Sequence, residues 1–166
     1  MNPPARSVRA TRHMVAAADQ LATEAGLAVL ALGGNAVDAA IATNAAIAVT
    51  GPHLCGMGGD LFAIVHDGRQ VHVLDAAGFA PAAADPDAIR SYGHTSMPFR
   101  HDIRTVTVPG CIDGWCALHA RFGSLPRADV LAPAIHLAEH GFPASPLLVG
   151  ADAQLDAAGR DELDEL

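Results

Sequence analysis

The sequence is short of aromatic residues, charged residues and cysteines. Phe, Trp and Tyr make up 4% of the 166 residues, so the core must be built mainly from small and aliphatic side chains. Charged residues make up 17% and hydrophobic residues 51%, a composition that is not typical of a disordered chain. The three cysteines, Cys55, Cys111 and Cys116, are odd in number and lack CxxC spacing, which fits neither a disulfide framework nor a zinc ribbon.

The charge and the apolar segments limit the kinds of partner. The formal net charge is -8, and a negative chain repels phosphate backbones, so we expect no nucleic-acid partner. The N-terminal stretch has no apolar core of a secretory signal. Asn35, Asp38 and Asn44 interrupt the apolar run from Gly26 to Gly51, which favours two buried helices over a membrane span. We therefore expect a cytoplasmic protein without membrane contact.

The pattern predicts several helices and one β-hairpin, an α+β architecture. Asn35 is a good helix N-cap, and Asp38 three residues later suits a capping box. Asp67–Gly68 is a strong hairpin turn. Residues 91–104 are predicted to form a loop. The expected strands are 61–66 and 70–74, and the expected helices are 19–32, 35–49, a short one from 86, 110–123, 126–141 and one from 146.

A glycine-rich turn, Gly56 to Gly59, lies between the second helix and the first strand. A dinucleotide-binding loop has the reverse order, with a strand before it and a helix after it, so we expect no cofactor here. The glycines favour a tight structural turn, and a nest of N–H groups for an anion is the alternative. Asp60 follows at once and is a candidate for binding a substrate amine or for holding the loop, the role we favour.

Two further patterns suggest chemistry, and each has a simpler interpretation. HLAEH places His136 and His140 one helical turn apart beside Glu139, as in some zinc peptidases. No third ligand follows, and His140 suits a helix C-terminus, so we expect no metal. Cys55 is a candidate nucleophile only with a base nearby and a lowered pKa, and a small buried apolar side chain is the simpler interpretation.

The run from Gly33 to Asp75 closely resembles the N-terminal part of the gamma-glutamyltransferase family, which carries a GGNAVDAA helix start, a PHxxGxGG turn and a following hairpin. The resemblance covers roughly residues 11–150. Further matching pieces follow in the same order: Thr107–Gly110, Gly114–Trp115, His119, Phe122–Gly123, Leu125–Pro126, Pro133–Ile135 and Gly141–Pro143. The resemblance implies a layered αββα N-terminal-nucleophile hydrolase, made as a precursor that cuts itself to expose a threonine nucleophile.

The resemblance also implies a domain organisation and a set of partners. Residues 1–10 are expected to be a flexible lead, 11–150 the N-terminal large-subunit region, and 151–166 an acidic end at which the chain is truncated relative to the family. The implied partners are the rest of the large subunit, a threonine-bearing small subunit and a small amide or γ-glutamyl substrate. No organic cofactor or metal is implied.

Two positions bear on the reaction that the resemblance implies. Thr95 follows His94, whereas the family's nucleophile lies in a Thr-Thr-His-like segment, so Thr95 is not expected to be the nucleophile and the chain alone is expected to be inactive. Ala77 falls where the family has an arginine that pairs with the substrate's α-carboxylate. Arg69, Arg100 and Arg104 remain possible substitutes.

The loss of that arginine, with the GMGGDLFA turn, resembles relatives that hydrolyse other amides, such as oxamate amidohydrolase or cephalosporin-acylase-like members. Two other hypotheses remain open. One is a free-standing scaffold or binding module that dimerises to cover apolar faces. The other is a small zinc peptidase built on HLAEH.

Overall fold

The computed structural model describes residues 8–98 and 102–152. The chain divides into two compact units, one formed by the segments up to Leu54 and from Phe122 onward, the other by Cys55–Arg121. The first unit contains helices α1 (Gln20–Ala31), α2 (Ala36–Thr50), α5 (Arg127–His140) and α6 (Pro146–Asp152). The second contains strands β1 (Leu61–His66) and β2 (Val71–Ala76), helix α3 (Pro86–Ser91), the 3₁₀ turn η1 (Ile103–Thr105) and most of helix α4 (Cys111–Phe122).

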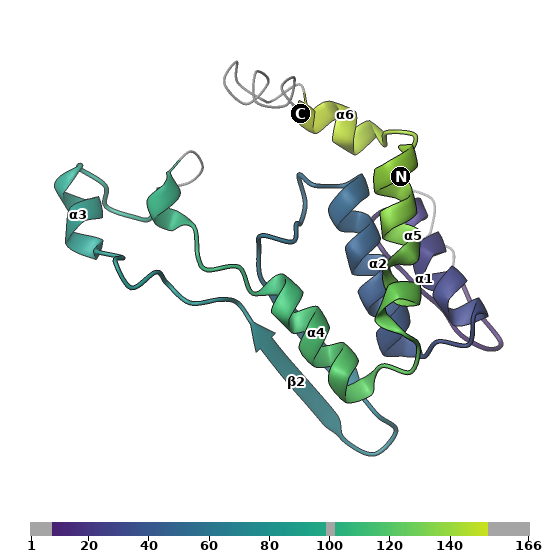
Figure 1. Cartoon of the computed structure of the whole chain (residues 1–166). Coiled ribbons are helices and arrows are strands. Elements are labelled where there is room, and N and C mark those ends of the chain that lie inside the picture. Colours follow the sequence, from purple (N-terminus) through teal and green to yellow (C-terminus); the bar gives the residue numbers. More distant parts are fainter. Residues whose placement is uncertain (1–7, 99–101, 153–166) are drawn as a thin grey trace, which may run out of the picture. The chain divides into compact units, whose positions relative to one another are not determined.

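In the first unit, α2 packs against both α1 and α5 (Figure 1). Alanine makes this close approach possible, because Ala22, Ala42 and Ala46 are fully buried. Gly26 on α1 faces α2 so closely that a Cβ there would lie 2.2 Å from Thr43 Oγ1. The expectation of a buried helix is confirmed for α2, whereas α1 is exposed on one side, where Leu27 is 38% accessible. The buried apolar residues of this unit are Ala22, Ala25, Val29, Val37, Ala39, Ile41, Ala42, Ala45, Ala46, Val130 and Ala134.

The junction between α1 and α2 follows the predicted capping chemistry. Gly33 has φ +94°, a conformation that side chains rarely adopt, and it turns the chain after α1. The Asn35 side chain then accepts the N–H groups of Val37 and Asp38, while the Asp38 carboxylate accepts the N–H of Asn35. The capping box predicted from the sequence is therefore confirmed.

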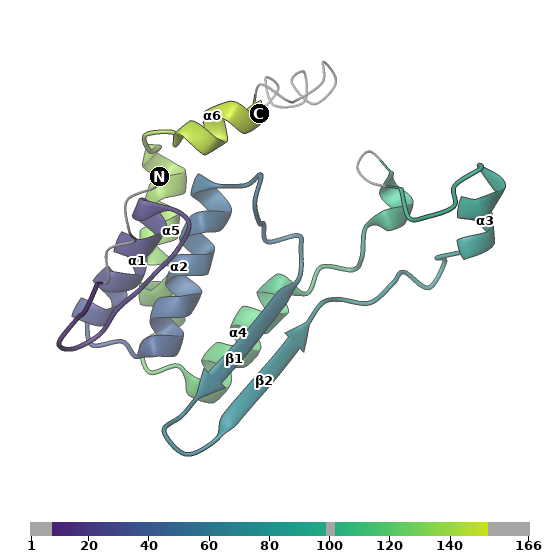
Figure 2. The same cartoon turned by 180° about the vertical axis from the view of Figure 1, so that it is seen from behind.

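In the second unit, the two strands form an antiparallel hairpin in which Leu61 pairs with Ala76 and His66 with Val71. One face is partly covered, and Figure 2 shows α4 running along the hairpin. Their approach is close at Gly114, where a Cβ would lie 2.7 Å from Leu61 Cδ2. The outer face is exposed and mostly apolar, with His66 and Asp75 as its polar members: Phe62, Ile64, Val71 and Val73 are 65%, 78%, 61% and 75% accessible.

Beyond β2 the chain passes through α3 and η1 before returning to α4. Asp85 caps α3 by accepting the N–H of Asp87. The Arg104 guanidinium lies 4.4 Å from the ring centre of Tyr92 and also bonds the Asp102 carboxylate. The hydrogen bonds from Arg104 lower the pKa of Asp102 to about 2.

The segment that leaves β2 and the segment that leads into α4 come very close to each other at Gly78 and Gly110. This close contact is called the glycine crossing. A Cβ on Gly78 would lie 1.9 Å from the carbonyl oxygen of Val108, and one on Gly110 would lie 2.2 Å from that of Ala76. Gly78 also has φ +78°. The N–H of Val108 donates to the carbonyl of Phe79 at 2.9 Å, so the two segments are hydrogen-bonded where they cross.

Most of the predicted elements are present with shifted ends. The second strand was predicted at residues 70–74 and lies at 71–76, because Asp75 and Ala76 find pairing partners in Phe62 and Leu61. The predicted loop 91–104 contains the start of η1. Residues 1–7 and 153–166, which hold most of the expected lead and acidic end, lie outside the described residues. No helix in the described part of the chain is long and apolar enough to cross a bilayer.

Candidate functional site

The open end of the hairpin brings together the two residues predicted for the substrate site. Asp60 immediately precedes β1 and Ala77 immediately follows β2, so both flank the paired residues Leu61 and Ala76. The Asp60 side chain is exposed. The backbone holds this turn, since the Gly59 carbonyl accepts the N–H groups of Gly110 and Cys111, both at 3.0 Å. The Asp60 carboxylate accepts no hydrogen bond among the described residues, which does not support the loop-holding role.

Ala77 presents a half-buried methyl group where the resemblance places an arginine. Its N–H donates to Asp75 Oδ1 at 3.0 Å. Arg69 lies in the hairpin turn, at the other end of a six-residue ladder and thus roughly 20 Å away. Arg104 is engaged by Asp102, and Arg100 lies outside the described residues. None of the described contacts places one of these arginines beside Ala77.

The glycine-rich turn is built as a structural turn. Gly56, Gly58 and Gly59 are absent from the positions with positive φ, so they do not form the alternating right- and left-handed pattern of an anion nest. The N–H of Gly59 donates to the carbonyl of Gly56 at 3.1 Å and so closes the turn internally. These contacts favour the tight-turn interpretation over the anion nest.

Cys55 and Cys111, both in the second unit, lack the lowered pKa of a nucleophilic thiol. Burial raises the pKa of the Cys55 thiol. Burial also raises the pKa of Cys111, and the nearby Cys55 and Asp60 raise it further. Both thiols are therefore protonated at neutral pH, which supports the interpretation of Cys55 as a small apolar side chain.

The HLAEH histidines pack against each other near the end of α5. The ring centres of His136 and His140 are 4.3 Å apart. His140 Nδ1 lies 3.0 Å from the His136 carbonyl oxygen, which fits a histidine at a helix C-terminus. Across residues 8–98 and 102–152, no group of three or more His, Cys, Asp or Glu side chains is placed to hold a metal ion.

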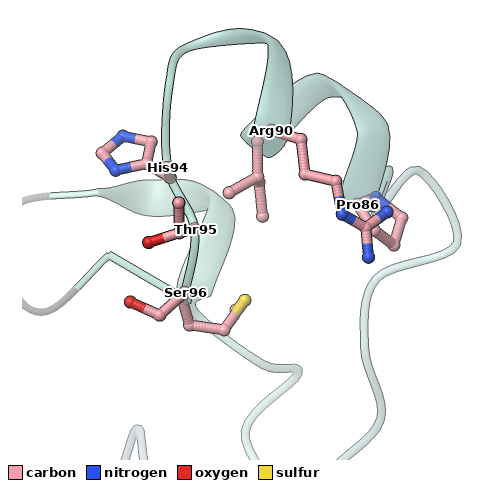
Figure 3. A pocket seen from close by; sticks show the side chains of 7 residues that line it. Pro86, Arg90, His94, Thr95 and Ser96 are labelled. Atoms are coloured by element: carbon pink, nitrogen blue, oxygen red, sulfur yellow. The ribbon is translucent and has the colours of Figure 1, made fainter.

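Thr95 lines a surface hollow of about 430 Å³ beside α3. Figure 3 shows the hydroxyl groups of Thr95 and Ser96 on the side away from Arg90. The Arg90 guanidinium is already paired with Asp87 at 2.7 Å. An N-terminal nucleophile uses its own free amine as base, whereas the Thr95 nitrogen is in a peptide bond with His94. The hollow is lined by Pro86, Ile89, Arg90, His94, Thr95, Ser96 and Met97.

Asp38 has a second role that the sequence pattern did not indicate. Its carboxylate accepts the Ser124 hydroxyl at 2.6 Å and the N–H groups of Ser124 and Leu125, in addition to the N–H of Asn35. Burial alone raises the pKa of Asp38, but hydrogen bonds from Ser124, Asn35 and Leu125 outweigh it and the net pKa is lowered. Asn35 contributes as well, because its amide donates to the Phe122 carbonyl at 2.6 Å.

The described residues form a helix-rich α+β arrangement with one hairpin, which is part of the layered N-terminal-nucleophile hydrolase fold. It aligns with the crystal structure of cephalosporin acylase from Bacillus halodurans with a TM-score of 0.78 and 34% identity, over 98% of this chain and 33% of that one. The fold class predicted from the sequence is therefore confirmed.

The chain belongs to the gamma-glutamyltranspeptidase family, whose model matches residues 22–158. It is 39% identical over 142 residues to the glutathione hydrolase-like YwrD proenzyme of Bacillus subtilis, covering 84% of this chain and 27% of that protein. It is 42% identical over 149 residues to the acylase ACY 1 proenzyme of Pseudomonas sp. strain V22, covering 83% and 26%. The chain thus spans about a quarter of the length of these two relatives.

Proposed function

We propose that this chain is the N-terminal part of the large subunit of a gamma-glutamyltranspeptidase-family amide hydrolase or acyltransferase. In the complete enzyme, a threonine freed by cleavage of the precursor would attack the amide carbonyl. Its own amine would accept the proton, and the acyl group would pass to water or to an amine. This chain would supply helical layers and part of the pocket wall, and its partners would be the rest of the large subunit and the threonine-bearing small subunit.

The observation that carries this proposal is the exposed apolar face of the hairpin. Phe62, Ile64, Val71 and Val73 alternate outward on two paired strands whose other face lies along α4. A two-stranded hairpin is marginal by itself, and an apolar sheet face normally packs against another layer. In the proposed complete enzyme, a second sheet supplied by its other segments would cover this face.

The chain by itself is expected to release no product from amide substrates, because it lacks a threonine with a free amine. Reading the gene beyond the codon for Leu166 tests the proposal first. An open frame that continues into a Thr-Thr-His-like segment should yield, when expressed whole, two polypeptides and amide hydrolysis. A stop codon at once, with no second frame that encodes the threonine, would refute the catalytic proposal.

The same apolar face supports a second candidate function, a scaffold or binding module that dimerises through the hairpin. The enzyme proposal and the scaffold proposal predict different oligomeric states of the chain in solution. Light scattering of the 166-residue chain should give a concentration-independent dimer for the scaffold, and Phe62→Ser with Val73→Ser should then yield monomers. A monomer that becomes active only with the threonine-bearing segment favours the enzyme.

The complete enzyme is expected to turn over simple neutral amides better than γ-glutamyl donors. The methyl group of Ala77 cannot pair with an α-carboxylate, whereas an arginine forms two parallel hydrogen bonds with one. Ala77→Arg should raise kcat/KM for a γ-glutamyl anilide by roughly tenfold or more. Ala77→Gln, which is long but uncharged, is the matched control. Efficient turnover of the γ-glutamyl anilide by the unmodified enzyme would contradict this substrate assignment.

A further inference from the structure

His72 lies between two charged side chains of the second unit. Its Nε2 is 2.8 Å from Asp67 Oδ2 in the hairpin turn, and its Nδ1 is 3.0 Å from a guanidinium nitrogen of Arg121 in the last turn of α4. Only 12% of the His72 side chain is accessible. The imidazole therefore connects the tip of the hairpin to the end of the helix that runs along it.

The chemistry of the two partners fixes the protonation state of the ring. A guanidinium group only donates hydrogen bonds, so the Nδ1 that faces Arg121 must present a lone pair. The ring proton is then on Nε2, where it donates to the Asp67 carboxylate. In this arrangement both ring nitrogens of His72 are in use.

We propose that His72 is a proton-operated latch between the hairpin and the end of α4. A proton that binds the ring can bind only at Nδ1, the atom that accepts from Arg121. The new N–H then faces a donor-only cation, so Arg121 must leave. The bond from Nε2 to Asp67 persists, because the carboxylate accepts equally well from the protonated ring. Acidification thus detaches Arg121 from His72 and breaks this side-chain contact between the last turn of α4 and the hairpin, while the hairpin turn stays closed.

The charge of Asp67 does not change together with that of His72, and the other titratable side chain in the last turn of α4 is His119. Hydrogen bonds from His72, and then from the N–H groups of Gln70 and Arg69, hold the pKa of Asp67 well below its usual range. Asp67 therefore stays ionised throughout the range in which histidines take up a proton. His66 and Asp75 of the same hairpin lie on its opposite, exposed face, and His66 Nδ1 accepts the N–H of Gly68 at 3.1 Å.

Nitrogen NMR of the ¹⁵N-labelled 166-residue chain tests the latch directly. At pH 7.5 the His72 spectrum should show an unprotonated Nδ1 and a protonated Nε2. Between pH 7.5 and 5.5, amide hydrogen exchange in the last turn of α4 should accelerate by about tenfold beyond the intrinsic pH effect, the factor expected for one lost charged hydrogen bond. Arg121→Gln should show the faster exchange at both pH values, and His66→Gln should keep the native pH step.

Two results would overturn the proposal. One is a protonated Nδ1 at pH 7.5 in the unmodified chain, a measurement that needs no variant to fold. The other is an unchanged pH step in Arg121→Gln. Because all the participating groups lie within residues 55–121, the latch stands or fails independently of the proposed enzymatic function.

Discussion

Replacing Asp38 by alanine is expected to lower the free energy of unfolding of the chain by roughly 3 kcal/mol. The carboxylate is fully buried and accepts hydrogen bonds from Asn35, Ser124 and Leu125. Its removal takes the shared acceptor away from these part-buried donors, and it removes the bonds from Ser124 and Leu125 that join the start of α2 to the segment before α5. Urea unfolding followed by circular dichroism measures the loss.

The loss in free energy of unfolding caused by Asp38→Ala should depend on pH. The folded-state pKa of Asp38 is lowered, so its ionisation stabilises the fold above the unfolded-state value near 3.8. That contribution disappears as the pH falls through the lower folded-state value. The difference in the free energy of unfolding between the native chain and Asp38→Ala should therefore be constant at neutral pH and become smaller below about pH 4.

Asp19→Ala is the matched control for Asp38→Ala. Asp19 also caps a helix, but within the described part of the chain its side chain accepts only the N–H of Ala22, which belongs to the helix that Asp19 caps. The free energy of unfolding of this variant should be about 1 kcal/mol lower than that of the native chain. Equal losses for the two variants would show that the contacts of Asp38 with Ser124 and Leu125 add nothing to an ordinary cap.

Gly110→Ala is expected to lower the free energy of unfolding by roughly 3 kcal/mol, because the new methyl group would collide with backbone atoms that cannot move aside. Its Cβ would lie 2.2 Å from the Ala76 carbonyl oxygen and 2.9 Å from the Gly78 nitrogen. Relief requires the two segments that cross here to separate, which would pull the start of α4 away from the end of β2. The fluorescence of Trp115, the single tryptophan of the chain, reports on α4 during urea unfolding.

Gly58→Ala provides the comparison for Gly110→Ala. No atom lies within 4 Å of the position its Cβ would take, and its φ is not positive. Its stability should therefore be unchanged or rise by up to about 1 kcal/mol through the reduced entropy of the unfolded chain. A similar loss in both variants would mean that the crossing tolerates a methyl group and that its tight contacts do not determine stability.

The parts of the fold that depend on neighbouring residues could be predicted from the sequence. The capping box of Asn35 and Asp38 and the Asp67–Gly68 turn both follow from side chains a few positions apart. The end of β2 depends on pairing with β1 and was placed two residues short. The glycine crossing joins positions 78 and 110, and no local pattern reveals such a contact.

In the candidate site, too, some features follow from local sequence and others depend on contacts between distant residues. The hairpin register alone brings Asp60 and Ala77 to one end of the sheet, so their proximity follows from predicted strands and a predicted turn. The substrate-binding role assigned to either residue stays a prediction. Asp38 was expected to cap a helix, and its bonds to Ser124 and Leu125 depend on tertiary packing. The pairing of His72 with Arg121 likewise joins residues 49 positions apart.

The discontinuity of the first unit imposes an order of events during synthesis. The Ser124 groups that donate to the Asp38 carboxylate lie 86 residues further along the chain. The whole hairpin unit is synthesised between the two. When the ribosome has released only the first two helices, α5 and the Ser124 donors do not yet exist. Helix α2 is then exposed on the face that later packs on α5. The second unit therefore emerges, and is free to fold, before the first can close.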